Sequence, residues 1–74
     1  MMTLKQLINE AFLYNQSCIL VVDSDTVIVD KISYEELKER LDKDLSNYAS
    51  RTVVMTEWYW DVHELIYRVD ITIK

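Results

Sequence analysis

Apolar residues recur every three or four positions in two stretches of the chain, and this spacing predicts two amphipathic helices. The first helix is expected to begin after Thr3, because Thr3 and Gln6 have the residue types and the spacing of a capping box. We expect it to end near Asn15. Its buried side is predicted to consist of Leu4, Leu7, Ile8, Ala11 and Phe12.

The second helix is predicted over residues 34–48 and begins after Ser33, which forms another capping-box pattern with Glu36. Apolar residues lie along one side of it, namely Tyr34, Leu37, Leu41, Leu45 and Tyr48. Residues of opposite charge lie four positions apart on the other side, in the pairs Glu36/Arg40 and Glu39/Lys43. Such pairs are typical of an exposed helix face, so we expect one side to pack and the other to face water.

The rest of the chain predicts four strands. β-Branched residues on both sides of the turn sequence DSD predict a hairpin with strands at 18–22 and 27–31. A second hairpin is predicted around the sequence TEWYWDV, with a loop at 61–64. A loop of this even length matches the apolar sides of the two strands, and an odd length would not. The cross-strand pairs expected from it are Trp60/Leu65, Trp58/Tyr67, Thr56/Val69, Val54/Ile71 and Glu57/Arg68.

These elements predict a single small α+β domain over residues 1–74, with the order α-β-β-α-β-β. The simplest arrangement is a two-layer sandwich, in which two helices cover one face of a four-stranded antiparallel sheet. Trp58 and Trp60 would then point toward the helices as core residues, since alternate residues of a strand lie on one face. The opposite face is expected to carry Ile19, Val21, Ile28, Val53, Met55, Tyr59 and Ile66.

This predicted opposite face is too apolar to be left in water, because an antiparallel sheet with one wet face normally alternates apolar and polar residues. Two arrangements would still bury it within a monomer or divide it: one helix on each face, or two separate small sheets. If neither holds, the face forms an interface with another protein or with a second copy of the chain. A homodimer would also add buried surface to a domain of this small size.

The composition excludes several kinds of site. The chain has no glycine and no proline, which rules out glycine-rich phosphate loops and leaves Asp, Asn and Ser to form the turns. Cys18 is the only cysteine and His63 the only histidine, so an internal disulfide is impossible and a zinc site made of His and Cys is not expected. We therefore expect neither a metal nor a cofactor.

The net charge of −5 disfavours direct binding to nucleic acid, because the phosphate backbone repels an acidic protein. The residues expected to form an acidic surface are Asp23, Asp25, Asp30, Asp61 and Glu64. If they lay in one plane with few basic residues between them, the surface could imitate the phosphates of DNA. The charge thus predicts a protein partner rather than a nucleic acid.

The sequence CILVVDSDTV resembles the first motif of the haloacid dehalogenase-type phosphatases, in which an apolar strand is followed by two aspartates. In that family the first aspartate attacks phosphorus, the second handles the proton and Mg²⁺ neutralises the phosphate. Here the two positions are Asp23 and Asp25. The family's later motifs lie on successive strands of a parallel sheet, for which the remaining residues leave no room. We therefore do not expect an enzyme.

The pattern and the charge together predict a small acidic protein-binding module that acts through an apolar sheet face. Proteins of this build are frequent among phage and mobile-element accessory proteins, which suggests one that inhibits or modulates a host protein. The alternative is a self-associating, homodimeric structural or scaffolding protein without a separate ligand. The N-terminal sequence lacks the features of a signal peptide and no stretch is apolar enough to span a membrane, so we expect a cytoplasmic protein that contacts no membrane.

Overall fold

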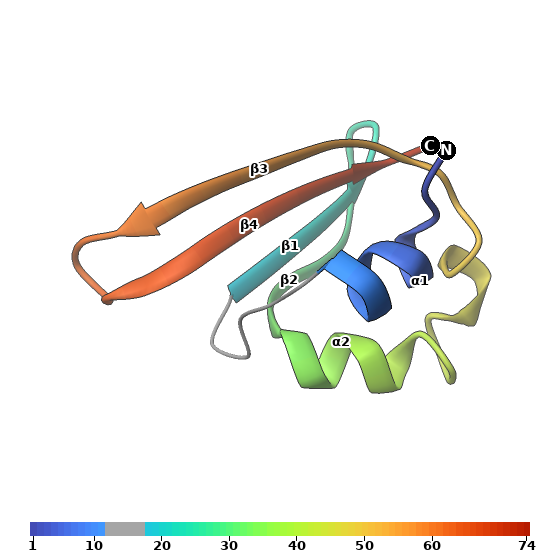
Figure 1. Cartoon of the computed structure of the whole chain (residues 1–74), viewed down its shortest axis with the longest axis horizontal. Helices are drawn as coiled ribbons and strands as arrows, with labels where there is room; N and C mark the ends of the chain where they lie inside the picture. Colours follow the sequence, from blue (N-terminus) through green and yellow to red (C-terminus); the bar gives the residue numbers. More distant parts are fainter. Residues whose placement is uncertain (12–17) are drawn as a thin grey trace.

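The computed structural model describes residues 1–11 and 18–74 and has an α+β fold built on one mixed four-stranded sheet (Figure 1). The predicted α+β class is thereby confirmed. The elements in chain order are α1 (Leu4–Gln6) with a π-helical continuation (Leu7–Ala11), β1 (Cys18–Asp23), β2 (Thr26–Ser33), α2 (Tyr34–Arg40), a 3-10 turn (Ser46–Tyr48), β3 (Val53–Asp61) and β4 (Ile66–Ile73).

Helix α1 begins at the predicted capping box, and both of its hydrogen bonds are present. The Gln6 amide donates to the Thr3 hydroxyl oxygen at 3.1 Å, and the Thr3 amide donates to the Gln6 side-chain oxygen at 2.9 Å. Leu4 and Ile8 are fully buried against the sheet. The expected helix end near Asn15 and the apolar Phe12 lie outside the described residues.

Helix α2 is shorter than predicted, since its α-helical part ends at Arg40 and not at residue 48. The segment after Arg40 contains several Asp, Asn and Ser residues. Their side chains form hydrogen bonds with nearby backbone groups and so compete with the hydrogen bonds of a helix. The chain continues in tight turns, in which the Lys43 amide donates to the Arg40 carbonyl at 3.0 Å. The apolar side nevertheless packs as predicted, because Leu37, Leu41 and Leu45 are all buried.

One of the two expected ion pairs on the wet side of α2 is formed. Lys43 Nζ lies 2.7 Å from Glu39 Oε1. Arg40 instead pairs with Asp44, four residues after it, with an N–O distance of 2.7 Å. Both pairs are exposed to solvent, so neither contributes much to stability.

The sheet has the strand order β2-β1-β4-β3, and its two central strands are parallel. The expectation of an entirely antiparallel sheet was therefore wrong. The two hairpins are antiparallel as predicted, but they join through β1 and β4, with Cys18 opposite Arg68 and Asp23 opposite Ile73. Residue alternation within a hairpin indicates its faces, but it contains no information on which strand of one hairpin pairs with the other.

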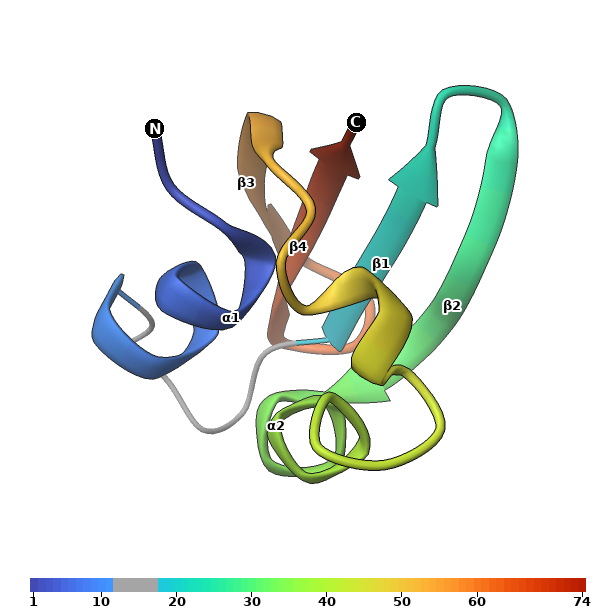
Figure 2. The ribbon, with the colours of Figure 1, turned by 90° about the vertical axis from the view of Figure 1, so that its right-hand side faces the viewer.

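The core lies between the sheet and the helical segments, which Figures 1 and 2 show on the same side of the sheet. Among the described residues it consists of the buried apolar side chains of Leu4, Leu7, Ile8, Ile19, Val21, Val29, Ile32, Leu37, Leu41, Leu45, Val69, Ile71 and Ile73. Ile19 and Val21 are only 0% and 1% exposed, so their assignment to an open outer face was wrong. They pair with Val69 and Ile71 of β4, and residues directly paired across strands point to the same face.

The β3–β4 hairpin has a different register from the predicted one, with Trp60 opposite Tyr67 and Trp58 opposite Val69. The shift is two residues, because the loop comprises residues 62–65 and not 61–64. A shift by two keeps each side chain on its predicted face, so both tryptophans do share a face with Val69. They are 43% and 47% exposed, however, and the expectation that they are core residues was wrong.

The corrected face assignment predicts a large loss of stability for one substitution and almost none for another, although the sequence pattern placed both residues on the same face. Ile19→Ala should lower the free energy of unfolding by about 2–5 kcal/mol, because it leaves a cavity in the core. Met55→Ala, at a position that is half exposed, should change it by no more than about 0.5 kcal/mol. Urea unfolding followed by circular dichroism measures both, and similar losses from the two variants would contradict the assignment.

Candidate functional site

The outer part of the β3–β4 hairpin is the most exposed apolar region that the structure describes. It extends away from the helices, and none of the residues from Glu57 to Arg68 is buried (Figure 1). We call this part the hairpin arm (residues 57–68). It makes the molecule elongated, with dimensions of 33 × 24 × 21 Å. Its exposed large apolar residues are Trp58, Tyr59, Trp60, Val62, Leu65 and Tyr67.

The side of the arm that faces the helical layer is aromatic. Trp58, Trp60 and Tyr67 lie on it, because Trp58 is paired with the core residue Val69 and Trp60 with Tyr67. The rings of Trp60 and Tyr67 meet edge to face, with their centroids 5.0 Å apart and their planes at 68°. Such a contact contributes about 0.5–1.5 kcal/mol and holds both rings in a defined orientation. The aromatic side is therefore ordered as well as exposed.

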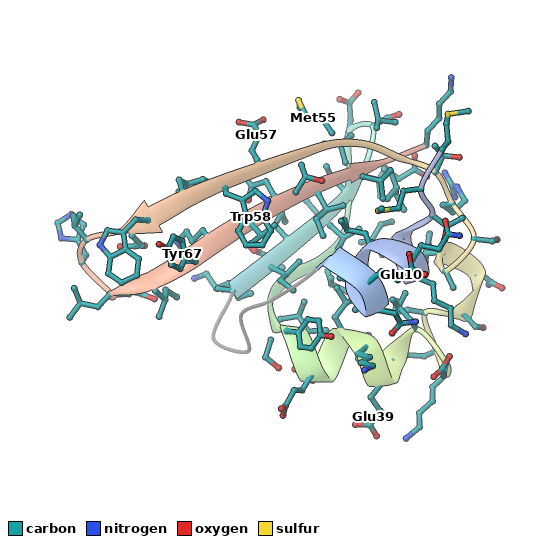
Figure 3. The ribbon with its side chains drawn as sticks, viewed as in Figure 1. Glu10, Glu39, Met55, Glu57, Trp58 and Tyr67 are labelled. Carbon is teal, nitrogen blue, oxygen red and sulfur yellow. The ribbon has the colours of Figure 1, made fainter. Side chains whose placement is uncertain are left out.

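The other side of the arm combines apolar and charged residues. Figure 3 shows Met55 and Glu57 pointing away from the helical layer, opposite to Trp58 and Tyr67. Tyr59 lies on the same side as Glu57 by strand alternation, and its hydroxyl donates to the two carboxylate oxygens of Asp70 at 3.3 and 3.4 Å. Loss of solvent around the hydroxyl, together with the negative charge of Asp70, raises the pKa of Tyr59 above its ordinary value. The phenol therefore stays protonated as a hydrogen-bond donor.

The loop at the end of the arm is organised by the carboxylate of Asp61. One of its oxygens accepts hydrogen bonds from the backbone amides of His63 and Glu64 at 2.9 and 3.1 Å. The other accepts from Arg68 Nε at 2.7 Å, and Glu64 lies 3.8 Å from the same guanidinium. The hydrogen bond from Arg68 lowers the pKa of Asp61 most, the bond from the Glu64 amide adds to it, and the value falls to about 2. Asp61 thus replaces the glycine-based turns that this chain lacks.

Leu65 closes this loop in an unusual conformation. Its φ angle is 57°, in the left-handed region that residues with a Cβ atom normally avoid, and its amide donates to the Asp61 carbonyl at 2.8 Å. The side chain is 69% exposed, so no packing within the described residues explains why a leucine stands at this position. A strained backbone that displays an apolar side chain to solvent is a typical feature of contact sites.

The outer edge of β3 is a second notable feature of the hairpin. β3 is the last strand of the sheet, and among residues 1–11 and 18–74 a further backbone pairing on that side is found only at its beginning. There the Val53 amide donates to the Met2 carbonyl at 2.9 Å, and Thr3 forms a bridge with Thr52. From Val53 to Trp60 the strand has a single charged residue, Glu57. It therefore has few of the charges that usually protect an edge strand from further pairing.

The seven residues expected to form an apolar interface do not form one surface. Ile19 and Val21 lie in the core, while Ile28 and Val53 are half-buried against it. Ile66 is half-buried at the start of β4, opposite Asp61. Only Met55 and Tyr59 are exposed, and both belong to β3. The sequence prediction missed the aromatic side of the arm, because spacing showed the tryptophans on the helix side but did not show that the helices end before reaching them.

The five residues expected to form an acidic surface lie at different ends of the sheet. Asp23 is next to Ile73 and Asp61 is opposite Ile66, at the two ends of β4, about 23 Å apart at ~3.3 Å per residue. The remaining three, Asp25, Asp30 and Glu64, are exposed. Three of the five have basic partners, since Asp23 lies 2.6 Å from Arg51, and Asp61 and Glu64 lie 2.7 and 3.8 Å from Arg68. This arrangement does not have the single plane of free carboxylates that imitation of DNA would require.

No other chemical site is evident among residues 1–11 and 18–74. No three His, Cys, Asp or Glu side chains there lie close enough together to hold a metal ion. None of the helices in that part of the chain is long and apolar enough to cross a membrane. Comparison of the chain with protein-family models, with curated proteins and with solved structures finds no match. The geometry and charge of the hairpin are therefore the basis for assigning a function.

Asp61 gives the arm a defined dependence on pH. Its pKa is lowered from 3.8, so the stabilisation that it provides is fully present above the unfolded-state value and is lost as the pH falls through about 2. An NMR titration of the Asp61 carboxyl carbon should give a midpoint near 2. In Arg68→Gln the midpoint should move upward but stay below 3.8, because the two backbone donors remain. A wild-type midpoint near 3.8 would show that the contacts are not maintained in solution.

Leu65 provides a second test of the loop. Leu65→Gly should raise the free energy of unfolding by about 0.5–1 kcal/mol, because glycine adopts a positive φ without strain and the exposed side chain contributes little packing. Val62→Gly is the matched control, since Val62 is an exposed residue of the same loop and is not among the residues with positive φ. It should lower stability by about 0.5–1 kcal/mol. Thermal unfolding measures both, and a loss of stability in Leu65→Gly would contradict the loop conformation.

Proposed function

We propose that this protein acts by binding another protein and that the hairpin arm is its contact surface. The observation that carries this proposal is the projection of the arm beyond the helices, with large apolar side chains exposed on both of its sides. Contiguous exposed apolar surface on a small domain marks an interaction site more often than a chance feature. The proposed surface is the arm and not the sheet face expected from the sequence pattern.

The residue types on the arm support this proposal. Trp and Tyr are the residues most enriched among those that dominate binding energy, and the arm has Trp58, Trp60, Tyr59 and Tyr67 within 12 residues (57–68). The arm is also held in place before any partner binds, because β4 continues into the centre of the sheet. A rigid contact surface loses little conformational entropy on binding.

Leu65 supports the same proposal from a different direction. Glycine or asparagine would suit its backbone conformation better, so the leucine costs stability. An apolar side chain at the end of a projecting loop is well placed to enter a pocket of a partner. The neighbouring Val62 is 65% exposed and would extend the same contact.

The charges of the molecule indicate the kind of partner surface that fits. The chain has a net charge of −5, and the arm has the exposed carboxylates of Glu57 and Glu64 beside its apolar residues. A partner with an apolar centre and basic residues around it would match this distribution. Association with such a partner should become slower as the salt concentration rises.

A second candidate function is self-association in a homodimeric structural protein. The observation that favours it is the outer edge of β3, which is long and has only one charge between Val53 and Trp60. This candidate uses the edge of the hairpin, whereas the first uses the side chains of the arm.

The proposal is tested by affinity capture from the native cell with two matched variants. Trp60→Lys places a charge on the aromatic side of the arm, while Val27→Lys places the same charge on an equally exposed position of β2. A protein captured by the wild type and by Val27→Lys should be lost or at least about tenfold weaker with Trp60→Lys, because central aromatic residues dominate such contacts. Circular dichroism and thermal unfolding check that both variants fold.

The result has to be repeated with the purified captured protein, by titration calorimetry against all three forms of the chain. Equal affinities for the wild type and Trp60→Lys would overturn the proposal that the arm is the contact surface. A captured protein whose binding also fails with Val27→Lys would place the contact elsewhere on the sheet.

A further inference from the structure

The two edge strands of the sheet differ sharply in how they are protected from further pairing. β2 has two register shifts against β1, the adjacent charged residues Asp30 and Lys31, and a backbone with φ of 55° at Lys31. Bulges and charges of this kind are the usual means by which proteins block an edge. β3 has one register shift, between Val53 and Met55, and is regular from there to Asp61.

The regular part of β3 is also limited at both ends. Before it, Val53 is bonded to Met2 at 2.9 Å, and after it the chain turns into the loop 62–65. An added strand could therefore run along β3 from Met55 to Asp61. The middle residue of this stretch is Trp58.

A second copy of the same chain can pair with this edge only in certain registers. Antiparallel pairing about a two-fold axis perpendicular to the sheet keeps the faces of both sheets aligned, and paired residues must point to the same face. Because side chains alternate, one residue must then lie directly opposite its own copy. The register that uses the whole stretch from Met55 to Asp61 places Trp58 opposite Trp58 of the second copy.

The charges favour this same register. With Trp58 at the centre, Glu57 lies opposite Tyr59 of the second copy, and Asp61 lies opposite Met55. A centre one residue earlier would place Glu57 against its own copy, and a centre one residue later would place Glu57 against Asp61. Like charges directly opposite each other destabilise a strand pair. Neither neighbouring register avoids this repulsion.

From these observations we propose that two copies of the chain pair through β3, antiparallel and centred on Trp58, so that their two sheets join into one continuous sheet. This dimer specifies the register of the second candidate function, self-association through the edge of β3, and rests on it, whereas it is independent of binding to a foreign protein. It uses backbone hydrogen bonds along a stretch whose only charged residues are Glu57 and Asp61. It also gives a domain of this size the additional buried surface that small domains often need.

The pairing would cover part of the exposed apolar surface. Because the two strands run in opposite directions, the arm of each copy lies beside the beginning of β3 in the other, with Trp60 opposite Thr56. Figure 2 shows α1 below the β3 side of the sheet, and Figure 3 shows Trp58 pointing toward the helical layer. Trp60 shares this face by strand alternation. The helical layer of one copy would therefore lie near the aromatic side of the other copy's arm.

The proposal predicts a specific dependence on salt. Each copy has a net charge of −5, so the two repel each other, and added salt should strengthen the dimer by screening this repulsion. A foreign partner with basic residues would show the opposite dependence. The two kinds of association can therefore be distinguished in the same buffer series.

The first measurement is analytical ultracentrifugation of the wild type over a range of concentrations and salt. The average molecular mass should rise with protein concentration from the 8.8 kDa of the single chain toward twice that value. The protein concentration at the midpoint of this monomer–dimer transition should fall as salt is added. Hydrogen exchange at the same concentrations should slow for amides of residues 55–61 and stay unchanged for β2. A mass that stays at 8.8 kDa up to about 1 mM protein would overturn the proposal, as would slowing confined to other segments.

The second measurement tests the register with charges placed at Tyr59. In Tyr59→Glu, Glu57 of each copy lies opposite a second glutamate at position 59 of the other copy, which places two pairs of like charges at the interface. This variant should weaken the dimer at least about tenfold. Tyr59→Lys places opposite charges in the same two pairs and should strengthen it. Val27→Glu, on the other edge strand, is the matched control for net charge and should leave the dimer nearly unchanged.

The double variant Glu57→Lys with Tyr59→Glu should recover the affinity that Tyr59→Glu loses. Equal effects of Tyr59→Glu and Tyr59→Lys, or of Tyr59→Glu and Val27→Glu, would overturn the register. Circular dichroism checks the fold of each variant, and the hydrogen-exchange result stands even if one of them does not fold. Failure of this proposal leaves the capture experiment with Trp60→Lys unaffected, because that experiment measures a foreign protein.

Discussion

The parallel pairing of β1 with β4 determines most of this structure. It places Ile19 and Val21 beside Val69 and Ile71, and these four residues form the floor of the core on which the helical segments pack. It also leaves β3 and β2 as the two edges of the sheet. β4 begins at Ile66, whereas its pairing with β1 begins at Arg68. The outer part of the β3–β4 hairpin therefore extends past the start of this pairing. The arm is thus a direct result of a length difference between paired strands.

The absence of glycine has consequences that are visible at two turns and at one position within β2. Ser24, Lys31 and Leu65 all have positive φ angles, a conformation that glycine would adopt without strain. Side-chain hydrogen bonds and ion pairs hold the chain near two of them. Asp61 organises the loop that ends at Leu65, and Asp23, next to Ser24, is bonded to Arg51 at 2.6 Å. The acidic residues at these turns are therefore structural in part.

Local features of the sequence predicted local structure well. The Thr3 capping box is formed in full, the Ser33 hydroxyl caps α2 by accepting from the Glu36 amide at 3.2 Å, and both hairpins are present. The predicted pairing of residues in the β3–β4 hairpin was wrong by two positions, because the hydrogen bonds of Asp61 that begin the loop could not be read from alternation. Its even loop length was correct, which is why the faces of Trp58 and Trp60 were still assigned correctly.

Features that depend on distant parts of the chain were not predictable in this way. Nothing in the spacing of apolar residues indicates that β1 pairs with β4, and this one contact moves Ile19 and Val21 from an open face to the core. The exposure of the tryptophans depends on where the helical layer ends, and Figure 1 shows the arm projecting past the end of the helical layer at which α2 begins. The excess of apolar strand residues was a sound reason to expect exposed apolar surface, but most of the exposed large apolar residues of the sheet lie on the hairpin arm and not on the predicted face.

The two ends of the described chain lie together at the opposite end of the molecule from the arm. Met2 is bonded to Val53 and the Lys74 amide donates to the neighbouring Thr52 carbonyl at 2.9 Å, so residues 1 and 74 flank the same short segment (Figure 1). Arg51 Nε also donates to the Lys74 carbonyl, at 2.8 Å. A short peptide could join these ends, which makes the domain suited to circular permutation. A fluorophore or an immobilisation tag attached at either terminus would stay clear of the aromatic side chains of the same copy.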